Sequence, residues 1–129
     1  MLDIGIGTRA SRVPHSDQPS LSLDDDGYYW FIEPLFKQLA GQTGQYIDLY
    51  GHSHFEGADL TALQETLDQA DVLIEAQPES WAVIVGHAGA RGEVWMGVVK
   101  NRFREILSDW LHLCEQAQKQ GLAVVCFGD

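Results

Sequence analysis

The sequence predicts one α/β or α+β layered domain, in which a mixed β-sheet is covered by about three helices. Short apolar or alternating segments are interleaved with longer segments whose apolar residues recur every three or four positions, in the order β-α-β-α-β-β-α-β. The chain has 129 residues and is 45% hydrophobic, enough for one substantial core. We therefore expect residues 1–129 to form a single globular domain.

The first strand is expected at residues 2–7, where Leu2, Ile4 and Ile6 alternate with polar residues or glycine. The next segment, residues 8–27, is rich in Ser, Pro and Asp and has little periodicity. Long irregular segments of this kind are functional or disordered. We predict that residues 8–27 form a mobile loop.

An aromatic run, residues 28–32, precedes Pro34. Two structures fit this pattern. A helix could begin near Glu33 with Pro34 in its first turn, leaving the aromatic run extended, or one longer helix could bend at Pro34. In both cases Gly41 and Gly44 mark the end of the helix.

Residues 46–50 alternate between tyrosine or aspartate and aliphatic side chains, a pattern that predicts a strand. Asp59 is a suitable N-cap for a helix that runs from Leu60 to about Gln77, since apolar residues recur there at helical spacing. Pro78 closes this helix.

Residues 81–85 and 94–99 are predicted to form a hairpin. The clearest helical periodicity covers residues 103–117, and Gly121 supplies its C-terminal stop. The last apolar run, residues 122–127, is typical of a strand buried on both faces.

Two residue types allow further expectations about the core. Cys114 and Cys126 fall in a predicted helix and a predicted strand, so we expect two buried free thiols and no disulfide. Three tryptophans on regular elements are expected in the core as well: Trp81, Trp95 and Trp110.

The net charge of −11 originates between Asp24 and Glu79, where twelve carboxylates accompany one base, Lys37. Such a single-sign surface attracts basic partners and repels polyanions. Nucleic acid and anionic membranes are excluded as partners, because both require basic surface. The charge therefore favours a basic protein partner.

No apolar run approaches the about 20 residues that cross a bilayer, and the N-terminal residues lack the pattern of a signal peptide. We expect a cytoplasmic protein. Its oligomeric state is open.

The leading hypothesis is a non-enzymatic binding module without a cofactor, such as an immunity protein or an inhibitor of a basic toxin or nuclease. Carboxylates on the second helix would steer the partner, and the segment 46–50 would supply anchors that contact basic side chains. The proposed contacts are Asp59, Glu65, Asp68, Asp71 and Glu75 for steering, with Tyr46, Asp48 and Tyr50 as anchors.

The alternative is a small metal-dependent hydrolase. Gly51-His52-Ser53-His54 resembles a metal-binding motif of calcineurin-like metallophosphoesterases, although the other motifs of that family do not occur in this sequence. An independent mononuclear site for Zn²⁺ or Mn²⁺ would use His52 and His54 with a further ligand, Asp48, Glu56 or His87.

Overall fold

The structure is a computed structural model that describes residues 1–11, 13–87 and 92–129. Three helices and six strands follow one another along the chain. They are β1 (Leu2–Gly7), β2 (Ser20–Leu23), α1 (Gly27–Thr43), β3 (His52–Phe55), α2 (Ala58–Glu75), β4 (Ser80–His87), β5 (Glu93–Val99), α3 (Lys100–Gln120) and β6 (Ala123–Gly128).

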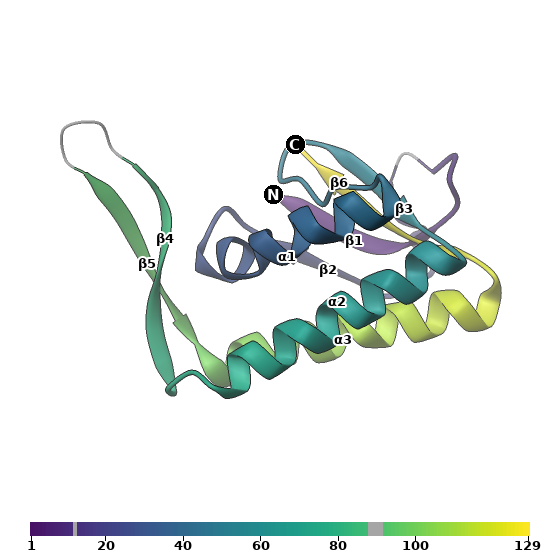
Figure 1. The fold of residues 1–129 in the computed structure, drawn as a ribbon. Coiled ribbons are helices and arrows are strands. Elements are labelled where there is room, and N and C mark those ends of the chain that lie inside the picture. The colour runs from purple at the N-terminus through teal and green to yellow at the C-terminus, as the bar shows by residue number, and fades with distance from the viewer. Residues whose placement is uncertain (12, 88–91) are drawn as a thin grey trace.

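Four strands form an antiparallel sheet in the order β2-β1-β6-β3, and β4 and β5 form a separate antiparallel ribbon. Helix α3 packs on β1, β2 and β6, while α2 lies between α1 and α3 (Figure 1). The predicted fold class, a single small α+β domain with three helices, is confirmed.

Strand β6 is an inner strand of the sheet, and both of its faces are buried. Cys126 and Val124 face the helices, whereas Val125, also buried, touches Gly7 on the other face. The segment after β1 folds back over that outer face: a Cβ atom at Gly5 would lie 2.5 Å from Pro14. The two glycines of β1 therefore leave room for this segment.

Helix α1 is continuous from Gly27 to Thr43 and contains Pro34, so a single longer helix is correct and the helix beginning at Glu33 is not. The side chain of Asp26 caps it by accepting a hydrogen bond from the amide of Tyr28 at 3.0 Å. Gly44 ends it in the left-handed conformation, with φ 76°.

Two expectations about strands are wrong. Residues 46–50 form no strand; the sheet hydrogen bonds are made by His52–Phe55 instead. Ile47 and Leu49 are nevertheless buried, as their alternation indicated, because they pack under the sheet end without joining a ladder. The predicted loop at residues 8–27 contains strand β2, which pairs with β1.

Helices α2 and α3 follow their predicted apolar stripes closely. Asp59 was predicted as the N-cap of α2, but the N-cap is Gly57. Asp59 lies in the first turn, where its negative charge interacts favourably with the positive end of the helix dipole. Gly121 ends α3 with φ 65°, as expected. Within the described residues no helix is long and apolar enough to cross a membrane.

The predicted burial of the cysteines is confirmed, whereas the predicted burial of the tryptophans is confirmed only in part. Cys114 and Cys126 are free and buried, as predicted. Trp110 is fully buried and Trp81 is partly buried against the core, but Trp95 is 54% exposed, so its placement in the core was wrong. The reason is that the β4–β5 ribbon projects away from the sheet instead of joining it (Figure 1).

Candidate functional site

Helix α2 separates its apolar and acidic residues. Leu60, Leu63, Leu67, Ala70 and Ile74 are buried, and a run of carboxylates occupies the flank next to this apolar stripe. At 100° per residue, four carboxylates fall within about one third of the circumference. We call this set the acidic helix face: Glu65, Asp68, Asp71 and Glu75.

Asp59 does not belong to this surface. It lies about 120° around the helix from Glu65, on the other flank of the apolar stripe. The five carboxylates predicted to steer a partner are therefore divided into four that share a face and one in the first turn of α2.

Ion pairs neutralise one end of the acidic helix face. Glu75 pairs with Lys100 at 3.8 Å and also with Arg104, both from α3. Among the described residues, Glu65, Asp68 and Asp71 have no ion pair. The uncompensated charge of α2 is thus concentrated in its middle turns.

One apolar side chain lies inside this acidic face. Val72 is 69% exposed and projects between the directions of Glu65 and Asp68 on the helix circumference. A large exposed aliphatic side chain surrounded by carboxylates is what the centre of an interface with a polar rim requires. The sequence analysis missed Val72, although the same helical wheel indicates its position.

The acidic helix face borders a groove against α3. This groove of about 350 Å³ is lined by Asp71 from α2 and by Arg104, His112 and Glu115 from α3, so α3 contributes both a base and an acid. Burial, followed by the charges of Cys126, Glu115 and Asp68, raises the pKa of Cys114 to about 12.

The segment 46–50 lies elsewhere, against α1. The hydroxyl of Tyr46 donates to the carboxylate of Glu33 at 2.8 Å, and Lys37 lies 3.5 Å from the same carboxylate. Tyr29 donates to the carbonyl of Ile47 at 2.7 Å. Glu33 is only 6% exposed, so this network holds the segment onto α1. Its three members on that helix, Tyr29, Glu33 and Lys37, were not among the site residues predicted from sequence.

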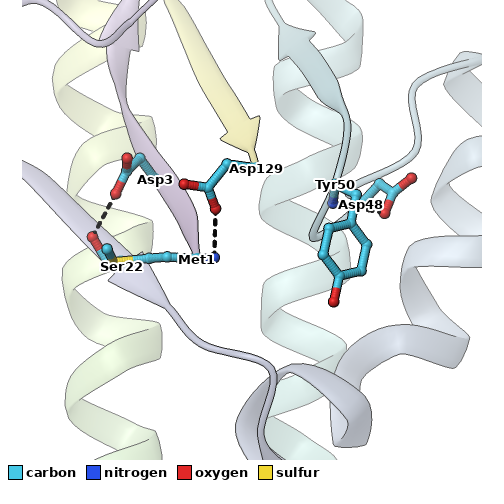
Figure 2. A network of polar contacts seen from close by, with 6 residues as sticks. All are labelled: Met1, Asp3, Ser22, Asp48, Tyr50 and Asp129. Carbon is cyan, nitrogen blue, oxygen red and sulfur yellow. Dashed lines mark hydrogen bonds and ion pairs between the residues drawn. The ribbon is translucent and has the colours of Figure 1, made fainter.

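Only one of the predicted anchors is presented to solvent in full. Burial, and the charges of Glu33 and Asp48, raise the pKa of Tyr46, whose hydroxyl is already engaged. Asp48 accepts a hydrogen bond from the amide of Tyr50 at 3.0 Å, and the ring of Tyr50 is 69% exposed (Figure 2). Tyr46 and Asp48 thus shape the turn that displays Tyr50.

Further carboxylates lie at the same end of the sheet. Asp3 accepts a hydrogen bond from Ser22 at 2.8 Å, and Asp129 pairs with the amino group of Met1 at 2.7 Å (Figure 2). The contacts of this end run through β1, β2 and β6, while those of the acidic helix face run to α3. The structure therefore presents two separate acidic regions.

The histidines of the metal-dependent alternative lie on β3. His52 and His54 alternate with buried Ser53 and so share the outer face of the sheet, where the ring of His52 contacts Phe127 with centroids 5.2 Å apart. Within the described residues, no three His, Cys, Asp or Glu side chains are grouped to hold a metal ion. The side chain of His87 lies outside the described set.

Asp48 and Glu56, the other ligands considered, have partners of their own: Asp48 accepts a hydrogen bond from the amide of Tyr50, and Glu56 lies 3.7 Å from Arg9.

No protein-family model matches this chain, and no curated protein or solved structure matches it either.

Proposed function

We propose that this protein binds a basic protein partner through the acidic helix face, in the manner of an immunity protein or an inhibitor. One observation supports this most: nearly all described basic side chains already form ion pairs within the fold, so they do not neutralise Glu65, Asp68 and Asp71 of the acidic helix face. Of eight Lys and Arg residues, Arg12 and Arg91 lie outside the described set. Five of the other six are ion-paired: Arg9, Lys37, Lys100, Arg102 and Arg104.

The middle of α2 then acts as a single-sign surface. Glu65, Asp68 and Asp71 attract a basic partner over about one Debye length, which speeds encounter more than it strengthens the final complex. Val72 offers an apolar contact that becomes desolvated only in the docked complex. The two kinds of residue should therefore affect different rate constants.

Affinity capture from the lysate of the source cells identifies the partner. Wild type is compared with a triple reversal, Glu65→Lys, Asp68→Lys and Asp71→Lys. A matched variant, Asp17→Lys, Glu79→Lys and Asp109→Lys, makes the same change in charge at exposed positions away from the acidic helix face. We expect a basic protein that wild type and the matched variant retain and that the triple reversal loses.

Stopped-flow measurements on the purified pair then separate the roles. The triple reversal should lower the association rate constant at least about tenfold, whereas Val72→Ser should mainly raise the dissociation rate constant. If the captured partner binds the triple reversal as fast as the matched variant, the acidic helix face is not the docking surface.

A further inference from the structure

The β4–β5 ribbon exposes apolar side chains on both faces. The described parts of its two strands carry one formal charge, Glu93. Isolated two-stranded ribbons are marginal in water, and exposed apolar edges promote pairing with other chains. Five large apolar side chains are at least 38% exposed: Ile84, Val94, Trp95, Met96 and Val99.

The chemistry of the ribbon limits what can cover it. A basic partner would gain little electrostatic attraction from the described parts of the two strands, because Glu93 is their one formal charge. An occupant must instead offer a neutral, apolar edge strand, and this chain carries one. The ribbon projects away from the sheet (Figure 1). Two copies that each carry a charge of −11 can therefore meet there without bringing their acidic surfaces together.

The two edges of the ribbon are not equivalent. Strand β4 has a bulge between Ile84 and Gly86, a feature that bends a strand and blunts its edge. Strand β5 runs from Glu93 to Val99 and holds four of the five exposed apolar side chains. The free edge of β5 is thus the better template for pairing.

The hydrogen bonds of β5 define which backbone groups are free. The amide of Val99 donates to the hydroxyl of Tyr28 at 3.1 Å, so it points away from β4. Because backbone groups alternate along an antiparallel strand, those of Gly97, Trp95 and Glu93 also point away from β4. Tyr28 closes the base of this edge, and among the described strands only β4 pairs with β5.

We propose that β5 pairs antiparallel with β5 of a second copy of this chain, with Trp95 opposite the partner's Trp95. This register makes Trp95 a hydrogen-bonded pair and yields about six main-chain hydrogen bonds between the copies. Glu93 lies opposite the partner's Gly97, so the two carboxylates do not face each other. A Cβ atom at Gly97 would meet nothing within 4 Å, and this space accommodates the indole rings.

The pairing gives a four-stranded sheet, β4-β5-β5-β4, with a twofold axis through Trp95. One strand per copy forms a smaller contact than the about 800 Å² per partner of standard interfaces. We therefore expect a weak dimer, with a dissociation constant on the order of 100 µM and a visible dependence on concentration.

Disulfide trapping tests the register directly. In the proposed dimer, Cα atoms at position 95 lie about 5.5 Å apart, within the range for a disulfide. The native thiols are buried and do not compete. Trp95→Cys should thus form a linked dimer under mild oxidation. Ile84→Cys is the control, since Ile84 pairs with Trp95 on the same ribbon but lies on the bulged strand.

Sedimentation velocity tests the edge. Wild type should show a species of twice 14.4 kDa, and Gly97→Pro, which removes an outward amide, should be monomeric with unchanged circular dichroism. Val13→Lys, at an exposed apolar site off the ribbon, should remain dimeric. A wild type that is monomeric at about 1 mM, or an Ile84→Cys variant that links as readily as Trp95→Cys, would overturn the proposal.

Discussion

Replacing Asp68 by asparagine should stabilise the protein, because Asp68 is the central charge of the acidic helix face. It lies three residues from Glu65 and three from Asp71, so it belongs to two like-charge pairs on one helix surface. No described Lys or Arg compensates any of these three carboxylates. Asparagine keeps the size of the side chain and has a similar helix propensity.

The expected gain follows from the two pairs removed. Each like-charge pair at this spacing costs about 0.2–0.5 kcal/mol, so Asp68→Asn should raise the free energy of unfolding by about 0.4–1 kcal/mol. In a domain of this size the melting temperature should rise by about 2–4 °C. Thermal and urea unfolding at about 10 mM salt measure this, and the gain should shrink at about 1 M salt, where the Debye length falls to about 3 Å.

Asp17→Asn is the matched control. It makes the same chemical change at an exposed loop residue outside the helices, and so it alters net charge equally. The reasoning is refuted if the control stabilises the protein as much as Asp68→Asn does, or if the gain from Asp68→Asn persists at high salt.

Three other outcomes are expected from unfolding experiments. Tyr46→Phe should cost about 1–3 kcal/mol of unfolding free energy, because buried Glu33 loses its hydroxyl donor; Tyr50→Phe, at an exposed ring, should cost nothing measurable. Burial raises the pKa of Cys114 and of Cys126 to about 12, so the stability from their neutral thiols is complete below about pH 8.5 and is lost as the pH rises toward 12. Each thiol should then remove about 1.4 kcal/mol per pH unit, and Cys126→Ala should make the alkaline decline shallower. Gly128→Ala should destabilise by about 1–3 kcal/mol, since its Cβ would overlap the backbone of Leu49, whereas Gly41→Ala, within α1 and in open space, should stabilise by about 0.5–1 kcal/mol.

The helices could be predicted from sequence because each buries a stripe that recurs at helical spacing. In α3, Phe103, Ile106, Trp110 and Ala117 are all buried, as the periodicity indicated. Strands β1 and β6 were predictable for the same kind of reason, since the alternation of β1 and the continuous apolar run of β6 are both typical of strands, although β1 also has its outer face covered at Gly5 and Gly7.

Strand pairing could not be predicted, because the partner of a strand lies far away in sequence. Alternation at residues 46–50 correctly indicated that Ile47 and Leu49 are buried. To form a strand, however, this segment would also need a neighbouring strand with an unpaired edge. The free edge of β6 is taken by His52–Phe55, in which one of the two inward-facing residues is the polar Ser53, so the segment lacks the apolar alternation that indicates a strand. Strand β2 has only four residues, Ser20–Leu23, and lies within a polar segment, but its alternation of Ser and Leu was a local signal of a strand.

In the candidate site, too, local spacing predicted some features, while others depend on contacts between distant parts of the chain. Glu65, Asp68 and Asp71 could be placed on one face from their spacing alone. The neutralisation of Glu75 could not be foreseen, because Lys100 and Arg104 reach it from another helix. The exposure of Trp95 also depends on tertiary structure, since the hairpin leaves the sheet that a local pattern would have it join.

The most direct test of the acidic helix face is the association rate constant of the captured partner as a function of salt. For wild type and for the matched variant, we predict a steep fall between about 50 mM and 500 mM salt. For Glu65→Lys with Asp68→Lys and Asp71→Lys, we predict a low rate constant with little dependence on salt. Equal rate constants and equal salt dependence for all three proteins would contradict the proposed function.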